Sequence, residues 1–285
     1  MGDALRAGFA DRVMAAVGQR GPLCAGIDPS PSLLAQWGLP DDGDGLHRFG
    51  LRCLEALDGV VAVIKPQVAF FERHGSAGLA AFESVVAEAR GAGFVVIADA
   101  KRSDIGTTMA AYAAAWLSPD SPLAADAVTA VAYLGIGALQ PLFDLAATHR
   151  RGVLVVVRSS NPEGRSLQRA RTDDGRGPAV EDLLLEEIAA RNRGGPGLAG
   201  TVGAVIGATL RPSAFPLPDL GGIILAPGVG AQGAGAADVA RLFAGCPPNS
   251  VVASASRSIL SAGPDPAALS AAAARTQEAM AKALN

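Results

Sequence analysis

The stretch FVVIADAKRSDIGTT, residues 94–108, carries an apolar run that ends abruptly in charged residues. Residues 94–98 are continuously apolar, as in a parallel strand that is covered on both faces. Asp99, Lys101 and Asp104 follow within the next six residues. Because polar groups at the carboxyl end of such a strand are typical of α/β sites, the stretch predicts a buried strand that opens on a site.

Apolar runs of this kind recur along the 285 residues, and helical patterns separate several of them, such as 77–92, 179–193 and 236–243. Eight strands with intervening helices predict an α/β protein, a (β/α)8 TIM barrel that forms a single domain over residues 1–285. A doubly wound open sheet is the alternative, because periodicity alone does not show closure. The expected strands are residues 23–27, 60–64, 94–98, 127–130, 153–157, 202–206, 222–226 and 250–253.

One connection breaks this alternation. Residues 161–177, NPEGRSLQRARTDDGRG, are polar and show no clear period. A connection of this length is usually functional or mobile, so we expect a long inserted loop at about 161–177.

The composition excludes several classes of protein. Hydrophobic residues make up 49% and charged residues 18%, which allows a large core, and the net charge of −3 comes without a basic run, which argues against nucleic acid as a partner. No apolar run reaches the ~18–20 residues of a membrane span. The N-terminal sequence resembles an amphipathic helix more than a signal peptide, so we expect a cytoplasmic protein without a membrane partner. Three cysteines without CxxC spacing indicate reduced, mostly buried thiols: Cys24, Cys53 and Cys246.

Lysine is rare in this chain. It has 21 arginines but three lysines, and Lys65 and Lys101 both directly follow expected strands, whereas Lys282 lies in the expected C-terminal helix. An arginine cannot release a proton near neutral pH, whereas a desolvated lysine can. The two strand-end lysines therefore favour chemistry that needs an ammonium group, with ordinary ion pairing as the alternative.

Four charged residues are expected around one mouth of the barrel, because catalytic residues of such barrels come from the carboxyl ends of several strands. Asp28 ends the first expected strand, Lys65 the second, and Asp99 and Lys101 the third. Asp99 and Lys101 are two residues apart, so they would point to the same side of an extended backbone. Such an array would present an anionic substrate with an electrostatic field that is already in place before the substrate binds.

A glycine-rich segment follows the seventh expected strand. Gly228, Gly230 and Gly233 match G-x-G-x-x-G, but no acid follows about 20 residues later, as a dinucleotide site would need. We expect a phosphate-binding loop instead, completed by Arg257 after the eighth strand, with a plain glycine turn as the alternative. The three histidines show neither zinc-ligand spacing nor a catalytic-triad context, so we expect surface or helix-packing residues at these positions.

Several motifs, in this order, resemble those of orotidine 5′-phosphate decarboxylase, in particular its longer bacterial subgroup: GIDPS (26–30), VIKPQ (63–67), DAKRSDIGTT (99–108), RSSNP (158–162) and APGVGAQG (226–233), closed by Arg257. The resemblance covers nearly the whole chain. It implies a homodimeric (β/α)8 barrel that needs no metal or organic cofactor and converts orotidine 5′-monophosphate to UMP and CO2, the last step of de novo UMP synthesis.

The resemblance also implies a role for each matching residue. Lys101 would give a proton to C6 of the pyrimidine, and Asp99 would lie beside the departing carboxylate. Lys65 and Asp28 would hold the ribose hydroxyls and the charge network.

The remaining positions would bind other parts of the substrate. Ser160 would contact the base, while Gln232 and Arg257 would hold the phosphate. Three residues would reach into the partner subunit's site: Asp104, Ile105 and Thr108.

Two positions depart from the family's pattern. Val131 stands where a polar His or Asn is usual, and Ser256 stands where many members have Gly. The nearest alternative function is that of a metal-dependent sugar-phosphate decarboxylase or aldolase of the same barrel superfamily. There the second strand typically ends in an acid, whereas here it ends in Lys65. A non-catalytic nucleotide-binding barrel is a further alternative. It would lack one or more of the charged residues at the strand ends, whereas all of them are present here.

Overall fold

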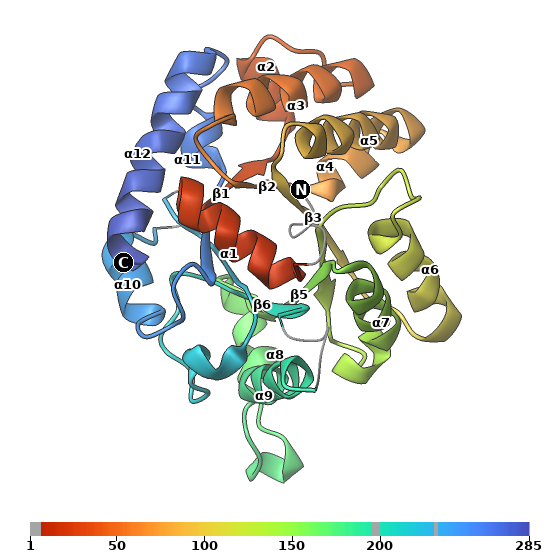
Figure 1. The fold of residues 1–285 in the computed structure, drawn as a ribbon, viewed down its shortest axis with the longest axis vertical. Coiled ribbons are helices and arrows are strands. Elements are labelled where there is room, and N and C mark those ends of the chain that lie inside the picture. The colour runs from red at the N-terminus through yellow and green to blue at the C-terminus, as the bar shows by residue number, and fades with distance from the viewer. Residues whose placement is uncertain (1–6, 195–199, 231–232, 285) are drawn as a thin grey trace.

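The computed structural model describes residues 7–194, 200–230 and 233–284, and it confirms the expected barrel (Figure 1). Eight parallel strands pair in chain order and close between the first and the last. The strands are β1 (Leu23–Ile27), β2 (Val63–Pro66), β3 (Val95–Arg102), β4 (Ala127–Val131), β5 (Gly152–Arg158), β6 (Val202–Ile206), β7 (Ile224–Pro227) and β8 (Val251–Ala255).

Helices surround the barrel and connect its strands (Figure 1). The α-helices are α1 (Phe9–Arg20), α2 (Pro31–Gln36), α3 (Gly43–Leu57), α4 (Val68–Glu72), α5 (Gly75–Gly91), α6 (Gly106–Leu117), α7 (Gln140–His149), α8 (Arg165–Gln168), α9 (Val180–Asn192), α10 (Ala236–Leu242), α11 (Arg257–Leu260) and α12 (Pro266–Leu284). Short 3-10 turns are η1 (Ile136–Leu139), η2 (Pro162–Gly164), η3 (Asp173–Gly175) and η4 (Leu217–Leu220). None of these described helices combines the length and the hydrophobicity of a membrane span.

The strands are apolar along their whole length because both of their faces are buried. Along β1, Cys24 belongs to a cluster inside the barrel, whereas its neighbours Leu23 and Ala25 belong to the cluster between the barrel and the helices. Cys24 and Cys53 are buried free thiols, and burial raises the pKa of Cys24 to about 12.

Helix α1 covers the N-terminal end of the barrel (Figure 1). Its residues Phe9, Val13 and Val17 are buried in the same cluster as the inward-facing side chains. The contact is close, since a Cβ on Gly152 of β5 would lie 2.3 Å from the Phe9 ring. With this end covered by the apolar face of α1, the carboxyl ends of the strands face the other, open end.

Strand β3 extends further than expected. The prediction that it ends at Ala98 is wrong, because Arg102 still pairs with Ala130 of β4 and Asp99 bridges to Gln67. Asp99 and Lys101 therefore lie within the strand rather than after it.

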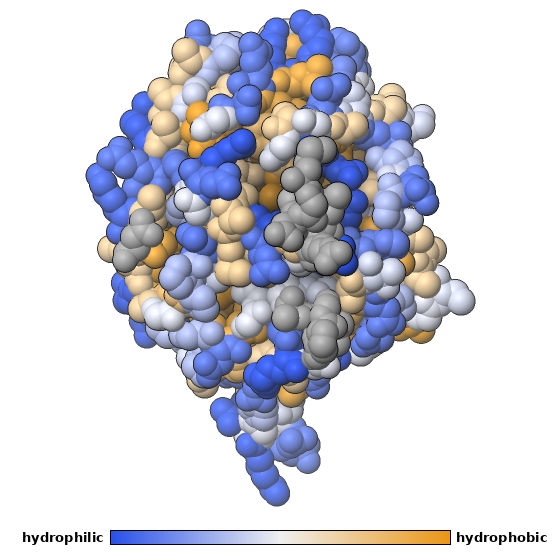
Figure 2. Space-filling view, viewed as in Figure 1, coloured by the Kyte–Doolittle hydropathy of each residue, from blue (hydrophilic) through white to orange (hydrophobic). Residues whose placement is uncertain are grey.

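The segment between β5 and α9 contains η2, α8 and η3. Most of residues 161–177 are exposed. This part of the chain projects at the bottom of Figure 1, where hydrophilic side chains dominate the surface in Figure 2. The segment leaves the barrel next to β5 and returns to it through α9.

Candidate active site

The open end of the barrel contains a cavity of about 280 Å³. Strands β1 to β3 bring four of the expected charged residues to its wall. The described residues that line it include Asp28, Lys65, Asp99, Lys101, Ser160 and Arg257. A second hollow, of about 650 Å³, adjoins it, and the two share Asp28, Gln67, Asp99, Lys101 and Arg257.

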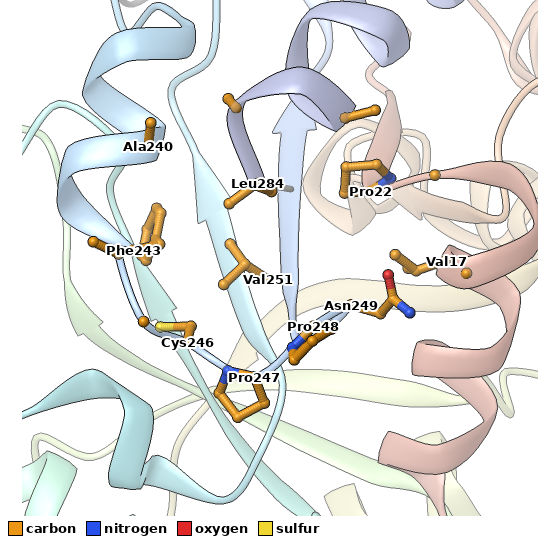
Figure 3. Close-up of a pocket in the computed structure, with 16 residues that line it drawn as sticks. Val17, Pro22, Ala240, Phe243, Cys246, Pro247, Pro248, Asn249, Val251 and Leu284 are labelled. Carbon is orange, nitrogen blue, oxygen red and sulfur yellow. The ribbon is translucent and has the colours of Figure 1, made fainter.

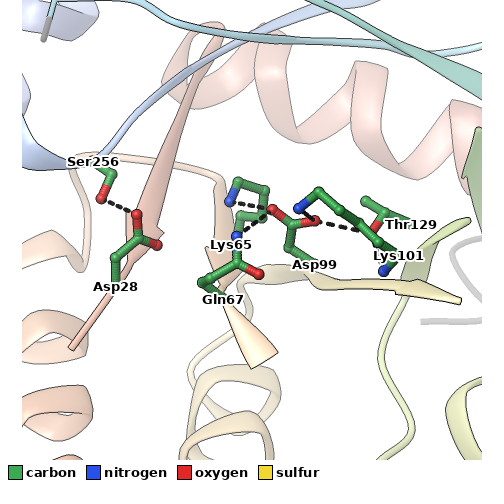
Figure 4. Close-up of polar contacts among 7 residues, drawn as sticks. All are labelled: Asp28, Lys65, Gln67, Asp99, Lys101, Thr129 and Ser256. Carbon is green, nitrogen blue, oxygen red and sulfur yellow. Dashed lines mark hydrogen bonds and ion pairs between the residues drawn. The ribbon is translucent and has the colours of Figure 1, made fainter. Parts of the chain in front are cut away.

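Asp99 is the centre of this arrangement (Figure 4). Its Oδ2 accepts hydrogen bonds from Lys65 Nζ and Gln67 Nε2, each at 2.9 Å. Its Oδ1 accepts from Lys101 Nζ at 2.6 Å and from Thr129 Oγ1 at 2.9 Å. Four donors on one carboxylate fix both its orientation and its charge.

The pKa values of the buried pair follow from these contacts. Burial by itself raises the pKa of Asp99, but the charges of Lys65 and Lys101 outweigh burial and hold it well below its usual range. Burial by itself lowers the pKa of Lys65, but the charges of Asp99 and Asp28 raise it above its usual value. At neutral pH the site therefore contains a carboxylate between two ammonium groups.

Lys101 reaches the carboxylate from an unusual backbone conformation. Its φ is 47°, in the left-handed region that only a few per cent of non-glycine residues occupy. The side chains of Asp99 and Lys101 do meet, as expected. The expected cause, strand alternation along an extended backbone, is wrong. The Lys101 side chain is 48% exposed, whereas that of Asp99 is 10% exposed, so the ammonium lies at the boundary between the buried pair and the cavity.

Asp28 lies beside this group and has a different partner (Figure 4). Ser256 Oγ donates a hydrogen bond to Asp28 Oδ2. Asp28 Oδ1 is buried and receives no hydrogen bond from the described residues. A buried carboxylate oxygen of this kind can accept a hydroxyl of a bound ligand.

The end of β5 supplies a polar wall. Ser160 lines the cavity, as does Ser159 next to it. Gln168 of the inserted segment holds Ser159 at two points: its Oε1 accepts the Ser159 backbone N–H at 3.1 Å, and its Nε2 donates to Ser159 Oγ at 2.7 Å. The inserted segment is thereby tied to the wall of the cavity.

The glycine-rich loop and Arg257 lie at another side. Gly228, Gly230 and Gly233 all have positive φ, between 74° and 104°. These conformations suit glycine and allow a close approach of the backbone to an anion. Arg257 is exposed at the start of α11 and lines both hollows. Gln232, the other expected phosphate ligand, lies outside the described residues.

The residues expected to serve the partner subunit do not line this chain's own cavity. Asp104 Oδ1 accepts the backbone N–H of Ile105 at 2.8 Å, at the point where β3 has ended. Ile105 is 61% exposed, and Thr108 is exposed on the first turn of α6. The structure therefore separates these three residues from Asp28, Lys65, Asp99 and Lys101 within one chain.

Comparisons with known proteins identify the family of this chain. Residues 21–273 match the sequence pattern described as "Orotidine 5'-phosphate decarboxylase / HUMPS family". A Salinispora arenicola protein named orotidine 5′-phosphate decarboxylase is 53% identical over 267 residues, which are 94% of this chain and 95% of that protein. The chain belongs to this family.

Solved structures of orotidine 5′-phosphate decarboxylases share the fold. A Streptomyces avermitilis crystal structure assigned to this enzyme superposes with a TM-score of 0.90 at 50% identity, covering 97% of this chain and 96% of that one. The Leishmania donovani OMP decarboxylase superposes with a TM-score of 0.73 at 27% identity, covering 97% and 99%.

Two polar residues of the site, Gln67 and Thr129, went unnoticed in the sequence, and no role in the site was predicted for Ser256. Gln67 and Thr129 both left a signal in the sequence. Gln67 lies two positions after Lys65, so strand alternation places the two side chains on the same side. Thr129 is the one polar residue of the apolar run 127–131. Ser256 is one of the two departures from the family's pattern, and its hydroxyl bonds a site residue directly. The other departure, Val131, lies at the end of β4, and its side chain has no polar atom that could replace that of a His or Asn.

A different cavity, of about 440 Å³, lies near the N-terminal ends of the strands, between α1, α10 and α12 (Figure 3). Among the described residues that line it, Cys246 has the one titratable side chain. Burial raises the pKa of this thiol to about 11, so it is protonated at neutral pH. The charged residues Asp28, Lys65, Asp99 and Lys101 line the cavity at the opposite end of the barrel.

Proposed function

We propose that this protein decarboxylates orotidine 5′-monophosphate to UMP and CO2, as the last step of de novo UMP synthesis in the cytoplasm. The observation that carries the proposal is the carboxylate of Asp99 held between the ammonium groups of Lys65 and Lys101 at the open end of the barrel. The names of the relatives support the same reaction.

The chemistry needs a positive charge beside one carbon. When the bond between C6 and the carboxylate breaks, CO2 leaves and the electron pair stays on C6, in an orbital that the π-system does not delocalise directly. An ammonium group beside C6 stabilises this charge, and one of its protons then forms the C6–H bond of UMP. Lys101 suits this role because its ammonium is partly exposed to the cavity while Asp99 holds it in place.

Asp99 and Lys65 prepare the site for this step. Asp99 lies where the substrate carboxylate would depart, and its Oδ1 holds the Lys101 amino group through a hydrogen bond of 2.6 Å. Lys65 is buried behind Asp99, and its charge keeps Asp99 ionised. Asp28 offers its Oδ1, which has no hydrogen-bond partner among the described residues, to a ribose hydroxyl.

The rest of the nucleotide is bound by polar groups around the cavity. Arg257 and the backbone of the glycine-rich loop would hold the phosphate, together with Gln232. Ser160 would contact the base. Binding energy from the phosphate, which is remote from C6, would help to order the site around the reacting carbon.

We also propose a homodimer with composite sites. Asp104, Ile105 and Thr108 are not among the described residues that line their own chain's cavity, so they are available to a partner's site. Apolar side chains are exposed on the same part of the surface, in the loops after the neighbouring strands β3 and β4: Ile105, Tyr133 and Leu134 at 61%, 73% and 52%. A two-fold axis through this surface would bury these side chains and complete both sites equally.

A spectrophotometric assay with orotidine 5′-monophosphate tests the proposal. The purified protein should convert it to UMP at the same rate with and without EDTA. Loss of activity in EDTA that Mg²⁺ restores would instead favour a metal-dependent sugar-phosphate decarboxylase or aldolase. The described residues contain no group of three or more His, Cys, Asp or Glu placed to hold a metal ion.

A further inference from the structure

The pairing between β3 and β4 is irregular next to Lys101. Ala98 pairs with Val128, and the next pair is Arg102 with Ala130. Three residues of β3, 99–101, therefore lie opposite a single residue of β4, which is Thr129. Irregular pairings of this kind occur next to active sites, where they redirect a side chain.

The hydroxyl of Thr129 connects the two functional residues of this bulge (Figure 4). Thr129 is 1% exposed. Its Oγ1 accepts the backbone N–H of Lys101 at 2.9 Å and donates to Asp99 Oδ1 at 2.9 Å. One hydroxyl can do both at once, because it has one proton and two lone pairs.

The backbone of Lys101 needs such support. A non-glycine residue at a φ of 47° is strained, and such a conformation persists when its surroundings determine it. The bulge also removes Lys101 from the regular pairing between β3 and β4. Its N–H is bound by a side chain on the neighbouring strand, which couples the position of the Lys101 backbone to that of β4.

We propose that Thr129 is a positioning residue for the reaction proposed above, on which this inference rests. Its hydroxyl holds the Lys101 backbone in the left-handed conformation and turns Asp99 Oδ1 toward the Lys101 ammonium. Thr129 acts through these two residues rather than on the substrate. A Val at this position would fill the same space but would lose both hydrogen bonds and leave a backbone N–H without its acceptor.

Steady-state kinetics of three variants test this role. Thr129→Val should lower kcat by about 10- to 100-fold while KM changes by less than about threefold, because misplacing a reacting group costs rate rather than binding. Thr129→Ser keeps the hydroxyl and should stay within about threefold of the wild-type kcat. Thr201→Val removes another buried side-chain hydroxyl, at the start of β6 and the opposite end of the barrel, and should leave kcat unchanged.

The inference would be overturned if Thr129→Val kept the wild-type kcat or raised KM alone. It would also be overturned if kcat fell as far in Thr201→Val as in Thr129→Val. Should Thr129→Val not fold, Thr129→Ala and Thr129→Ser make the same comparison, and equal kcat values in that pair overturn the inference. Amide hydrogen exchange of a peptide that contains residues 99–102 gives a readout without turnover. Exchange there should be faster in Thr129→Val than in Thr129→Ser, and equal exchange contradicts the inference. An inactive wild-type protein with that difference in exchange would contradict the proposed function alone.

Discussion

Lys65 Nζ lies 2.9 Å from Asp99 Oδ2, and the two side chains are 8% and 10% exposed. Each charge would be costly to bury alone, so each one depends on the other for its ionised state. Lys101 adds a second positive partner on the cavity side of the same carboxylate. The fold thus fixes the charges of the site before a substrate binds. The stability of the protein should therefore depend on pH, and the form of this dependence should identify the charged groups.

The acid side of this dependence follows from Asp99. Its pKa is held below the usual value in the folded protein, so its contribution to stability is present above the unfolded pKa of about 3.9 and is lost as the pH falls toward the folded pKa. The free energy of unfolding of the wild type, relative to Asp99→Asn, should therefore fall by up to about 1.4 kcal/mol per pH unit below pH 3.9. Urea unfolding between pH 2 and 7 measures this difference.

The matched control is Asp44→Asn, since Asp44 is an exposed carboxylate in a surface pair with Arg48. Its unfolding free energy should follow the wild-type curve. If Asp99→Asn also follows the wild-type curve, the carboxylate is not held by its lysine partners in the way the structure indicates. The raised pKa of Lys65 makes stability depend on pH in the opposite direction. The contribution of Lys65 to the free energy of unfolding is present below about pH 10.4 and is lost as the pH rises toward the folded pKa.

Lys101→Ala should abolish turnover and leave the fold intact. The ammonium would supply both the charge beside C6 and the proton, so kcat should fall by at least about 10³-fold. The Lys101 side chain is half-exposed, so circular dichroism and the melting temperature should change little. Lys282→Ala removes an exposed lysine that pairs with Glu278 on α12, and it should behave as wild type. Near-normal decarboxylation by Lys101→Ala would contradict the proposed mechanism.

Arg257→Ala should weaken the binding of phosphorylated substrate by roughly 2–4 kcal/mol, the cost of losing a charge-assisted contact in a closed site. Titration with UMP measures the binding, and added guanidinium should restore part of the activity. Arg241→Ala, which removes an exposed arginine of α10, is the control and should bind UMP as the wild type does. Unaltered affinity in Arg257→Ala, with no response to guanidinium, would show that Arg257 is not the phosphate ligand.

Mixing two inactive variants tests the composite site. If each site combines Lys101 of one chain with Asp104 of the other, a mixed dimer of Lys101→Ala and Asp104→Ala has one site that lacks both groups and one that is intact. Random exchange of equal amounts makes about half of the dimers mixed, so roughly a quarter of the wild-type activity should return. Mass spectrometry checks that exchange has occurred. No recovery after confirmed exchange would refute the shared site even if the protein is an active decarboxylase.

Much of the fold could be predicted because burial on both faces of a parallel strand leaves a direct mark on the sequence. Apolar runs such as 23–27 and 202–206 coincide with β1 and β6 in full. The ends of strands were harder, because they depend on pairing rather than on polarity. Strand β3 continues through three polar or charged residues, since its last residue still pairs with β4.

The sequence by itself determined the chemical inventory: two lysines and two aspartates at the ends of three strands, and the motifs that place the chain in its family. Only the tertiary structure decided how these groups meet. The left-handed backbone of Lys101 arises from the bulge opposite Thr129, and the bond from Ser256 to Asp28 joins residues that are 228 positions apart. Contacts between strands distant in the sequence depend on barrel closure and register, which local patterns of polarity do not encode.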